Sequence, residues 1–541
     1  MKDASGFDAV VVGAGFAGLY MLYRLRKLGL SAIVIEASED VGGVWYSNRY
    51  PGARCDMESL VYSYSFSSEL EQEWEWRQRF ASQPELLSYL RHVAERFELR
   101  RDIHFRTRVV AARYDEPANS WAVDTDRGKR YTARFLIMAT GCLSASHTPS
   151  FEGLESFGGE CFHTSAWPRE AVDFTGQQVA VIGTGSSGIQ CIPLIARQAA
   201  HLTVFQRTPN FSLPARNAPL DGEFVRRFKE SYPLYRERVR NGDLFGDGDL
   251  CVPIESLDPA PVSVTEASEE ERRRAYENRW ERGGGFFIGA FSDIMNTDEA
   301  NRTAADFVRN KIGTIVKDAR VARLLTPTDH PLGTKRLCID TDYYATFNRP
   351  NVTLVDLRSD PLEAITRRGI LLKSREVALD SIVMATGFDA MTGALLAIEI
   401  VGVGGSVLRD KWQHGPRTYL GLGIAGFPNL FTITGPGSPS VLSNTVMSIE
   451  QHVEWISDCI SFMSQRGLPR IQPTFEAEDN WLEQVSTAAD AWLYKKANSW
   501  YLGANIPGKP RVFMPYVDSG GAYRKICDRI AANHYEGFTF G

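Results

Sequence analysis

Two glycine-rich turns, each placed where an apolar strand would pass into a helix, constrain this chain more than any other feature. The first reads GAGFAG over residues 13–18, after the apolar run 7–12, and the second reads GTGSSG over residues 183–188, after the run 178–182. The amides of such a turn and of the following helix N-terminus can hold a pyrophosphate. The sequence therefore predicts an α/β fold with two Rossmann-like dinucleotide-binding units.

The residues that follow the two turns differ in charge. The strand expected over 31–35 ends at Glu36, a carboxylate suited to ribose hydroxyls, whereas the strand expected over 202–206 ends at Arg207 and Thr208. A cation at that place can meet a 2′-phosphate. These two patterns, a carboxylate after the first turn and a cation after the second, predict FAD at the N-terminal unit and NADPH at the middle unit.

Composition is typical of a soluble enzyme. The 541 residues include 60 basic and 66 acidic ones, so the net charge near −6 argues against nucleic acid as a partner. No apolar run approaches the ~20 residues of a membrane span. Residues 1–5 are polar and lead directly into the first strand, which leaves no room for a signal peptide. The eight cysteines form no CxxC pair and indicate neither a disulfide framework nor a zinc or other metal site, so we expect a cytoplasmic protein.

The two units are expected to be nested. An apolar strand over 135–139 ends in Thr140-Gly141, and a near copy ends in Thr386-Gly387, where the chain would pass between domains. This places an FAD-binding domain at 1–145 and 386–541, and an NADP-binding domain at 146–215 and 331–385. Residues 216–330 would form a helical insertion, with charged helices over 269–282 and 298–317 whose charged faces are solvated, and a loop over 242–261.

Two longer strings are more specific than the glycine turns. Residues 42–56 match GGxWxxxx[FY]PGxxxD, and residues 157–168 match FxGxxxHxxxW[PD]. With GTKR at 333–336, ATGFDA at 385–390 and SWYLGANIPGK at 499–509, they make the whole chain resemble the type I Baeyer–Villiger monooxygenases. Within that family it is most similar to the phenylacetone, cyclohexanone and steroid monooxygenase group.

The resemblance implies an enzyme that uses NADPH, FAD and O₂ to convert a ketone into an ester or lactone through a flavin C4a-peroxide, with sulfoxidation as a side activity. It assigns the catalytic cation to Arg336 and the carboxylate that orients it to Asp56. Arginine suits this role because it stays protonated at any working pH. Lys335 would join Arg207 and Thr208 at the 2′-phosphate. We expect a monomer or a small homo-oligomer, with the ketone and O₂ as its small-molecule partners.

The cofactor-binding residues are expected in both turns and in the strings. They are Gly13, Gly15, Gly18, Glu36, Val44, Trp45, Arg54, Asp56, Tyr62, Gly183, Thr184, Gly185, Ser186, Ser187, Gly188, Gln190, Arg207, Thr208, Lys335, Thr445 and Trp500. For Trp45 and Tyr62, packing in the core is an equally good interpretation.

Three further features carry weaker signals. His163 is expected to couple the domains rather than act on substrate, and Trp167 is expected to pack. In the family, the loop that carries Trp500 folds over NADP and substrate and excludes water. Residues 436–445 occupy the place where family members differ in substrate, and Thr445 and Cys142 depart from the phenylacetone type there. The ketone itself is therefore left open.

Three alternatives remain at this stage. An N-hydroxylating or sulfur-oxidising monooxygenase shares the second string in looser form, but the first string with Lys335-Arg336 argues against it. A disulfide reductase is disfavoured by the absence of a CxxC pair. A flavin-binding regulator that leaks H₂O₂ is disfavoured by the presence of Asp56, Lys335 and Arg336.

Overall fold

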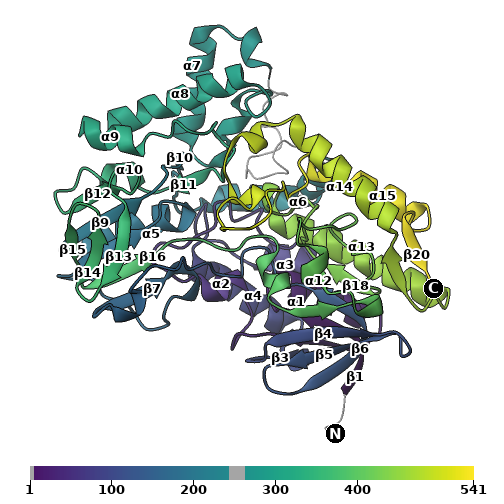
Figure 1. Ribbon diagram of the computed structural model, residues 1–541. Coiled ribbons are helices and arrows are strands. Elements are labelled where there is room, and N and C mark those ends of the chain that lie inside the picture. Colours follow the sequence, from purple (N-terminus) through teal and green to yellow (C-terminus); the bar gives the residue numbers. More distant parts are fainter. Residues whose placement is uncertain (1–4, 243–261) are drawn as a thin grey trace.

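A mixed sheet and a parallel sheet, each carrying one glycine turn, organise the chain (Figure 1). The computed structural model describes residues 5–242 and 262–541, so the predicted loop over 242–261 lies, apart from Gly242, outside the described residues. The α/β prediction with two Rossmann-like units is confirmed. We call the part built around the sheet of β1 (Ser5–Val12) the first lobe, and the part built around the sheet of β8 (Gln178–Ile182) the second lobe.

The sheet of the first lobe has eight strands in the order β17-β4-β5-β6-β1-β2-β3, with β18 paired to β6. Its strands are β1, β2 (Ala32–Ile35), β3 (Ile103–His104), β4 (Val109–Asp115), β5 (Ser120–Thr125), β6 (Arg130–Met138), β17 (Glu399–Val401) and β18 (Leu430–Thr432). Because β1 lies between parallel neighbours and is covered on both faces, Ala9, Val10 and Val11 are fully buried. This explains why β1 reads as a continuous apolar run.

The sheet of the second lobe has five parallel strands in the order β12-β9-β8-β16-β7. They are β7 (Glu160–His163), β8, β9 (His201–Gln206), β12 (Val352–Asp356) and β16 (Ser381–Met384). A small antiparallel sheet of β13 (Leu362–Thr366), β14 (Gly369–Leu372) and β15 (Glu376–Ala378) accompanies it. The short pairs β10 (Ser212–Pro214) with β11 (Cys338–Asp340), and β19 (Ile471–Pro473) with β20 (Phe538–Phe540), complete the strands of the described residues.

The helices surround the two sheets (Figure 1). They are α1 (Phe16–Lys27), α2 (Val44–Ser47), α3 (Ser68–Glu73), α4 (Gln83–Arg96), α5 (Ser186–Gln198), α6 (Gly222–Asn241), α7 (Glu269–Arg282), α8 (Asp298–Ile315), α9 (Ala319–Leu325), α10 (Tyr343–Thr346), α11 (Gly393–Leu396), α12 (Leu408–Lys411), α13 (Thr445–Gln465), α14 (Phe475–Asp490) and α15 (Gly520–Ala532).

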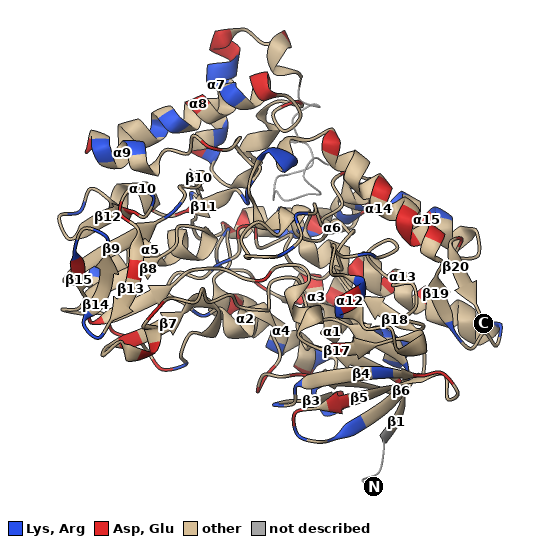
Figure 2. Ribbon diagram, viewed as in Figure 1, with Lys and Arg blue, Asp and Glu red and all other residues tan. Residues whose placement is uncertain are grey.

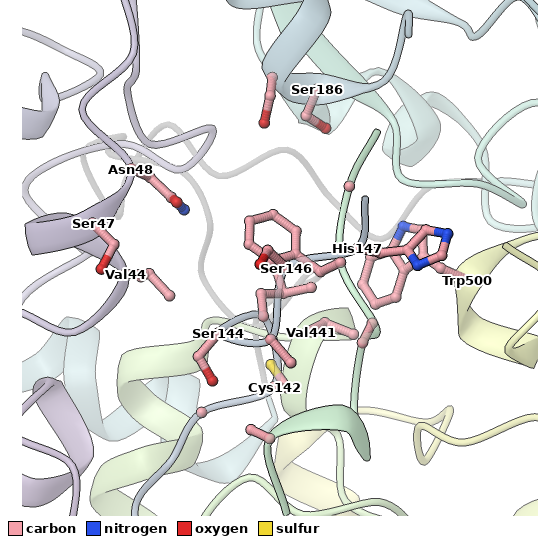
Figure 3. Close-up of a pocket in the computed structure, with 18 of the residues that line it drawn as sticks. Val44, Ser47, Asn48, Cys142, Ser144, Ser146, His147, Ser186, Val441 and Trp500 are labelled. Atoms are coloured by element: carbon pink, nitrogen blue, oxygen red, sulfur yellow. The ribbon is translucent and has the colours of Figure 1, made fainter. Parts of the chain in front are cut away.

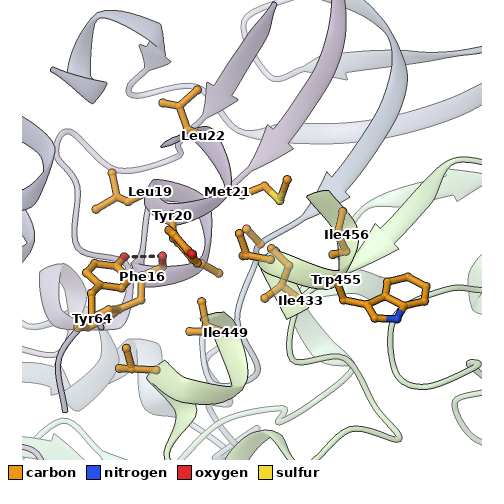
Figure 4. Packing of buried hydrophobic residues seen from close by; sticks show 14 of the residues in the cluster. Phe16, Leu19, Tyr20, Met21, Leu22, Tyr64, Ile433, Ile449, Trp455 and Ile456 are labelled. Carbon is orange, nitrogen blue, oxygen red and sulfur yellow. Dashed lines mark hydrogen bonds between the residues drawn. The ribbon is translucent and has the colours of Figure 1, made fainter. Parts of the chain in front are cut away.

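The core of the first lobe joins residues from both ends of the sequence. In Figure 4, α1 presents Phe16 and Tyr20 toward Ile449 and Ile456 of α13, and the hydroxyl of Tyr64 donates to the carbonyl of Phe16. This packing places the start of α1 against the start of α13, more than 400 residues later in the sequence. The first glycine turn is thereby held next to C-terminal segments.

The helices of region 216–330 divide between the two cores. Phe228, Tyr232 and Tyr235 of α6 pack in the core of the first lobe, whereas α7 buries Tyr276 and Trp280 in the core of the second. The charged helices expected over 269–282 and 298–317 form as α7 and α8, and Figure 2 shows their Lys, Arg, Asp and Glu residues. The domain boundaries themselves stay a prediction. In the described residues no helix has the length and apolar character needed to cross a bilayer.

The chain passes from the first sheet to the second after β6 and returns after β16, and these two crossing segments pair with each other. The amide of His147 donates to the carbonyl of Gly387 at 3.0 Å, and the amide of Asp389 donates to that of Ala145 at 2.9 Å. These are the segments that follow β6 and β16, where the sequence predicted the crossings. Both crossings therefore lie together, directly beside the space between the two glycine turns.

Candidate active site

One cavity of about 1430 Å³ lies between the lobes and is lined by nearly every predicted site residue. Figure 3 shows Val44 and Asn48 from the first lobe, Ser186 from the second, and Trp500 from the C-terminal segment around this space. The exceptions are Gly18 and Gly188, which lie behind the cavity wall. A Cβ on Gly18 would come within 1.8 Å of the carbonyl oxygen of Gly13, so these glycines allow helix and turn to pack closely rather than line the cavity.

Both glycine turns are shaped to receive an anion. The N-termini of α1 and α5 begin after Gly15 and Gly185, and neither helix has a side-chain cap, so backbone N–H groups are free to face a ligand. Gly13 and Gly183 have φ of +104° and +110°, which strongly favours glycine. A Cβ on Gly185 would meet nothing within 4 Å. At this position the backbone is open to close approach by a pyrophosphate.

The carboxylate of Glu36 is buried at the end of β2. One oxygen accepts from the amide of Ala14 and the other from that of Ser38, both at 2.6 Å. These bonds fix the carboxylate beside the first turn, while each oxygen keeps a second lone pair for a ribose hydroxyl.

The second turn faces positive charge. The side chain of Thr184 donates to the carbonyl of Thr208 at 3.1 Å, which ties the turn to the end of β9. Burial lowers the pKa of Lys335, an effect reinforced by the cations Arg207 and Arg358 and opposed by Asp329. Among the described residues, neither Lys335 nor the guanidinium of Arg207 has a hydrogen-bond partner, so both can serve an anion in the cavity.

Arg336 and Asp56 form a bidentate ion pair in the lining of the cavity. The Nε of Arg336 donates to Oδ2 of Asp56 at 2.8 Å and its Nη2 donates to Oδ1 at 2.7 Å. Its Nη1 donates to the carbonyl of Val441 at 2.9 Å. Arg336 keeps about a third of its side chain exposed, so the geometry presents a fixed, permanent cation to the cavity.

Full-length relatives match this chain over both lobes. It is 44% identical to "Baeyer-Villiger monooxygenase" of Pseudooceanicola batsensis, over 98% of this chain and 95% of the relative. It superposes on the solved structure "Oxidized steroid monooxygenase bound to NADP" with a TM-score of 0.93 and 52% identity, over 99% of each chain. The chain belongs to the Baeyer–Villiger monooxygenases. It is an NADPH- and FAD-dependent enzyme, as the sequence predicted.

Two further matches bear on the alternatives. The pyridine nucleotide-disulphide oxidoreductase family matches residues 10–230, the part that holds both glycine turns. All seven cysteines among the described residues are free, so that match reflects the shared nucleotide-binding fold. The chain is also 41% identical to "Phenazine N-monooxygenase PhzNO1" of Lysobacter antibioticus, over 99% of this chain and 97% of the relative. Oxidation of a heteroatom therefore has to be tested directly.

In this Baeyer–Villiger monooxygenase, two aromatic side chains and a threonine line the cavity from the first lobe. The indole N–H of Trp45 donates to the hydroxyl of Tyr62 at 3.3 Å, with the rings edge to face, and both line the cavity. Thr445 lines it from the first turn of α13. Trp45 and Tyr62 thus combine the two roles, packing and lining, that the sequence left open.

Gln190 and Arg54 connect the lobes. From α5, the Gln190 amide accepts from the hydroxyl of Tyr50 at 2.8 Å and donates to the backbone carbonyl of Arg54 at 3.1 Å. A Cβ on Gly52 would come within 2.6 Å of the carbonyl oxygen of Gln190. The Pro-Gly turn of the first string is therefore the place where the first lobe contacts α5, a contact that the sequence did not indicate.

His163 lies at the crossings and does not line the cavity. Its Nδ1 accepts from the amide of Ser165 at 3.2 Å, so Nε2 carries the proton and faces the carbonyl of His147 at 3.3 Å. Burial lowers its pKa, which favours the neutral ring. The position agrees with a role in joining the lobes. Trp167 packs against Phe162 and Phe174, as predicted.

The segment of Trp500 is fixed to the second crossing. Asn505 donates to the carbonyl of Phe388 at 2.7 Å, and Lys509 contacts the side chain of Asp389 and the carbonyl of Ala390. These bonds hold Trp500 at the cavity wall opposite the first lobe's Val44 (Figure 3). The two strings 385–390 and 499–509 thus bind each other.

Proposed function

We propose that the substrate is a ketone and that the Arg336–Asp56 pair carries the chemistry of its oxygenation. The observation that supports this most is the position of the pair: it lines the cavity onto which both glycine turns open. A permanent cation there faces the place where the two cofactors would meet the substrate.

The cavity fits both cofactors. The uncapped start of α1 and the carboxylate of Glu36 would hold the pyrophosphate and ribose of FAD, and the start of α5 would hold the pyrophosphate of NADPH. Lys335 and Arg207 would bind the 2′-phosphate, with Thr208 beside them. When bound, FAD reduced by NADPH supplies the activation of O₂.

Arg336 would stabilise the negative charge that develops as oxygen is transferred to the carbonyl carbon. Asp56 fixes the plane of the guanidinium through two parallel hydrogen bonds, and the carbonyl of Val441 fixes a third N–H. A preorganised donor of this kind needs little reorganisation at the moment of reaction. Asp56 is thus a positioning residue, and Arg336 is the catalytic one.

The segment 498–511 would exclude water from the finished site. Asn498, Ser499, Trp500, Ala504, Asn505, Pro507 and Arg511 line the cavity, and the bonds of Asn505 and Lys509 to the second crossing hold this wall in place. Exclusion of water favours transfer of oxygen to substrate over its release as H₂O₂. Cys142, Val441 and Thr445 border the same space and would shape the ketone pocket.

The test is NADPH consumption by the FAD-loaded enzyme under air, with and without a panel of cyclic, aryl and steroid ketones, nitrogen heterocycles and thioethers, and with mass spectrometry of the products. The proposal expects ketone-dependent consumption and a product heavier by one oxygen. If a nitrogen heterocycle or a thioether is the only class oxidised, the ketone assignment is wrong. Consumption that yields H₂O₂ alone across the panel contradicts oxygenation altogether.

We further propose sulfoxidation as a side activity, a cytoplasmic location, and a monomer or small homo-oligomer as the assembly. The thioethers in the same panel test the first of these. Light scattering on the FAD-loaded protein tests the last: a large assembly would contradict it.

A further inference from the structure

Arg358 and Asp329 lie beside the second glycine turn, and the sequence pattern indicated neither. Parallel pairing of β12 with β9 places Asp356 opposite Gln206, so the residues that follow the two strands leave the sheet at the same edge. The Nε of Arg358 donates to the backbone carbonyl of Arg207 at 2.6 Å. The position of Arg358 is therefore fixed by the same residue that supplies the predicted phosphate-binding cation.

Asp329 supplies a negative charge at this edge, in addition to Asp356, whose carboxylate accepts from the amide of Arg358 at 3.1 Å. The Oδ1 of Asp329 lies 2.7 Å from Nδ1 of the buried His330, and its Oδ2 lies 3.8 Å from Nη1 of Arg358. Asp329 lines the cavity and acts electrostatically on Lys335. At 3.8 Å the contact with Arg358 is a loose ion pair rather than a hydrogen bond.

Three cations, Arg207, Lys335 and Arg358, thus lie near Asp329: Arg207 and Lys335 line the cavity with it, and Arg358 adjoins them through its contacts with Arg207 and Asp329. Arginine has five N–H donors, and only one of those of Arg358 is used by the Arg207 carbonyl. A phosphate dianion offers more charge and more acceptor oxygens than Asp329, so it would replace the carboxylate as the partner of Arg358.

We propose that Arg358 is a third cation of the 2′-phosphate site and that Asp329 is the counter-charge with which the phosphate competes. The inference rests on the proposed assignment of NADPH to the second lobe. It makes Arg358 a residue that selects NADPH over NADH. It makes Asp329 a residue that weakens binding of the same phosphate, so the two substitutions have opposite effects.

The test is calorimetric binding of adenosine 2′,5′-bisphosphate and of 5′-AMP to the FAD-loaded enzyme. Because one charge-assisted hydrogen bond is lost, Arg358→Ala should raise the Kd of the bisphosphate about tenfold and change the Kd of 5′-AMP by less than about twofold. Asp329→Asn should lower the Kd of the bisphosphate about threefold, because it removes a negative charge that repels the phosphate. Arg358→Gln should reproduce the alanine variant. The matched control is Arg368→Ala, an exposed arginine paired with Glu376 on the small antiparallel sheet, which should change neither Kd.

The outcomes separate the two levels of the proposal. If the unmodified enzyme does not prefer the bisphosphate to 5′-AMP, the NADPH assignment itself fails. If it does, but Arg358→Ala weakens both ligands equally or neither, the role of Arg358 is overturned. If Asp329→Asn raises the Kd of the bisphosphate, Asp329 positions the cations instead of competing with the phosphate, and its proposed role is overturned. Equal melting temperatures of the variants show that binding, not folding, is being measured.

Discussion

Replacement of Arg336 by alanine should slow oxygen transfer strongly while leaving the fold intact. With an effective dielectric constant of about 20 and a separation of about 4 Å, a guanidinium stabilises a unit negative charge by about 4 kcal/mol. Asp56 offsets part of that field, since its carboxylate lies 2.7 Å from the guanidinium. We therefore expect a fall of about 10²–10³ in the rate of product formation, as for the loss of one preorganised donor.

The assay compares NADPH consumption, H₂O₂ and ester or lactone formed by the FAD-loaded variants. Arg336→Lys keeps the charge but not the paired hydrogen bonds, so it should retain more activity than alanine. The matched control is Arg79→Ala, which breaks another arginine–carboxylate pair, with Glu58 at 2.7 Å, away from the cavity. It should lower the melting temperature without changing the fraction of NADPH converted into product. Product formation by Arg336→Ala within tenfold of the unmodified enzyme would refute the reasoning.

Four further outcomes are expected. Asp56→Asn should slow product formation about 10- to 100-fold, because both N–H groups of Arg336 lose their charged acceptor and one of them loses its acceptor altogether. A normal rate would remove Asp56 from the mechanism. Trp500→Ala should raise the share of NADPH that ends as H₂O₂, measured by peroxide assay; an unchanged share would contradict its role in excluding water. Gly183→Ala should lower the free energy of unfolding by about 1–3 kcal/mol, because φ is positive there and the new Cβ would lie 2.4 Å from the carbonyl oxygen of Ala385. Gly185→Ala should keep the melting temperature and raise the Kd of NADP⁺. Equal effects of the two substitutions would contradict these separate roles. Burial lowers the pKa of Lys335, so this side chain loses its charge at a lower pH than a free lysine does. KM for NADPH should therefore begin to rise at a lower pH in the unmodified enzyme than in Lys335→Arg, whose guanidinium stays charged. The same pH dependence of KM in both enzymes would contradict this.

The sequence predicts most of the frame of the site because backbone requirements leave a direct mark on it. The apolar run 178–182 coincides with β8, and the positive φ of Gly13 and Gly183 explains why glycine occurs there. The strands before the two crossings could be located because both end in the same Ala-Thr-Gly sequence. In each case a local rule of conformation fixes residue identity.

Contacts between distant segments could not be predicted in this way. The amphipathic pattern of α6 indicates that one face is buried, but not that the face packs in the first lobe. The acceptor of the third hydrogen bond of Arg336 is the backbone carbonyl of Val441, which any residue would supply. Asp329 and Arg358 read as ordinary charged loop residues, because their partners are set by the parallel pairing of two strands.

Incorporation of labelled oxygen tests the central claim most directly. The FAD-loaded enzyme is supplied with NADPH, a ketone that stimulates NADPH consumption, and ¹⁸O₂ in unlabelled water, and the product is analysed by mass spectrometry. The account predicts one ¹⁸O atom in the ester or lactone, at the position between the carbonyl carbon and the migrated carbon. An unlabelled product, or ¹⁸O recovered only as hydrogen peroxide with the ketone unchanged, would contradict it.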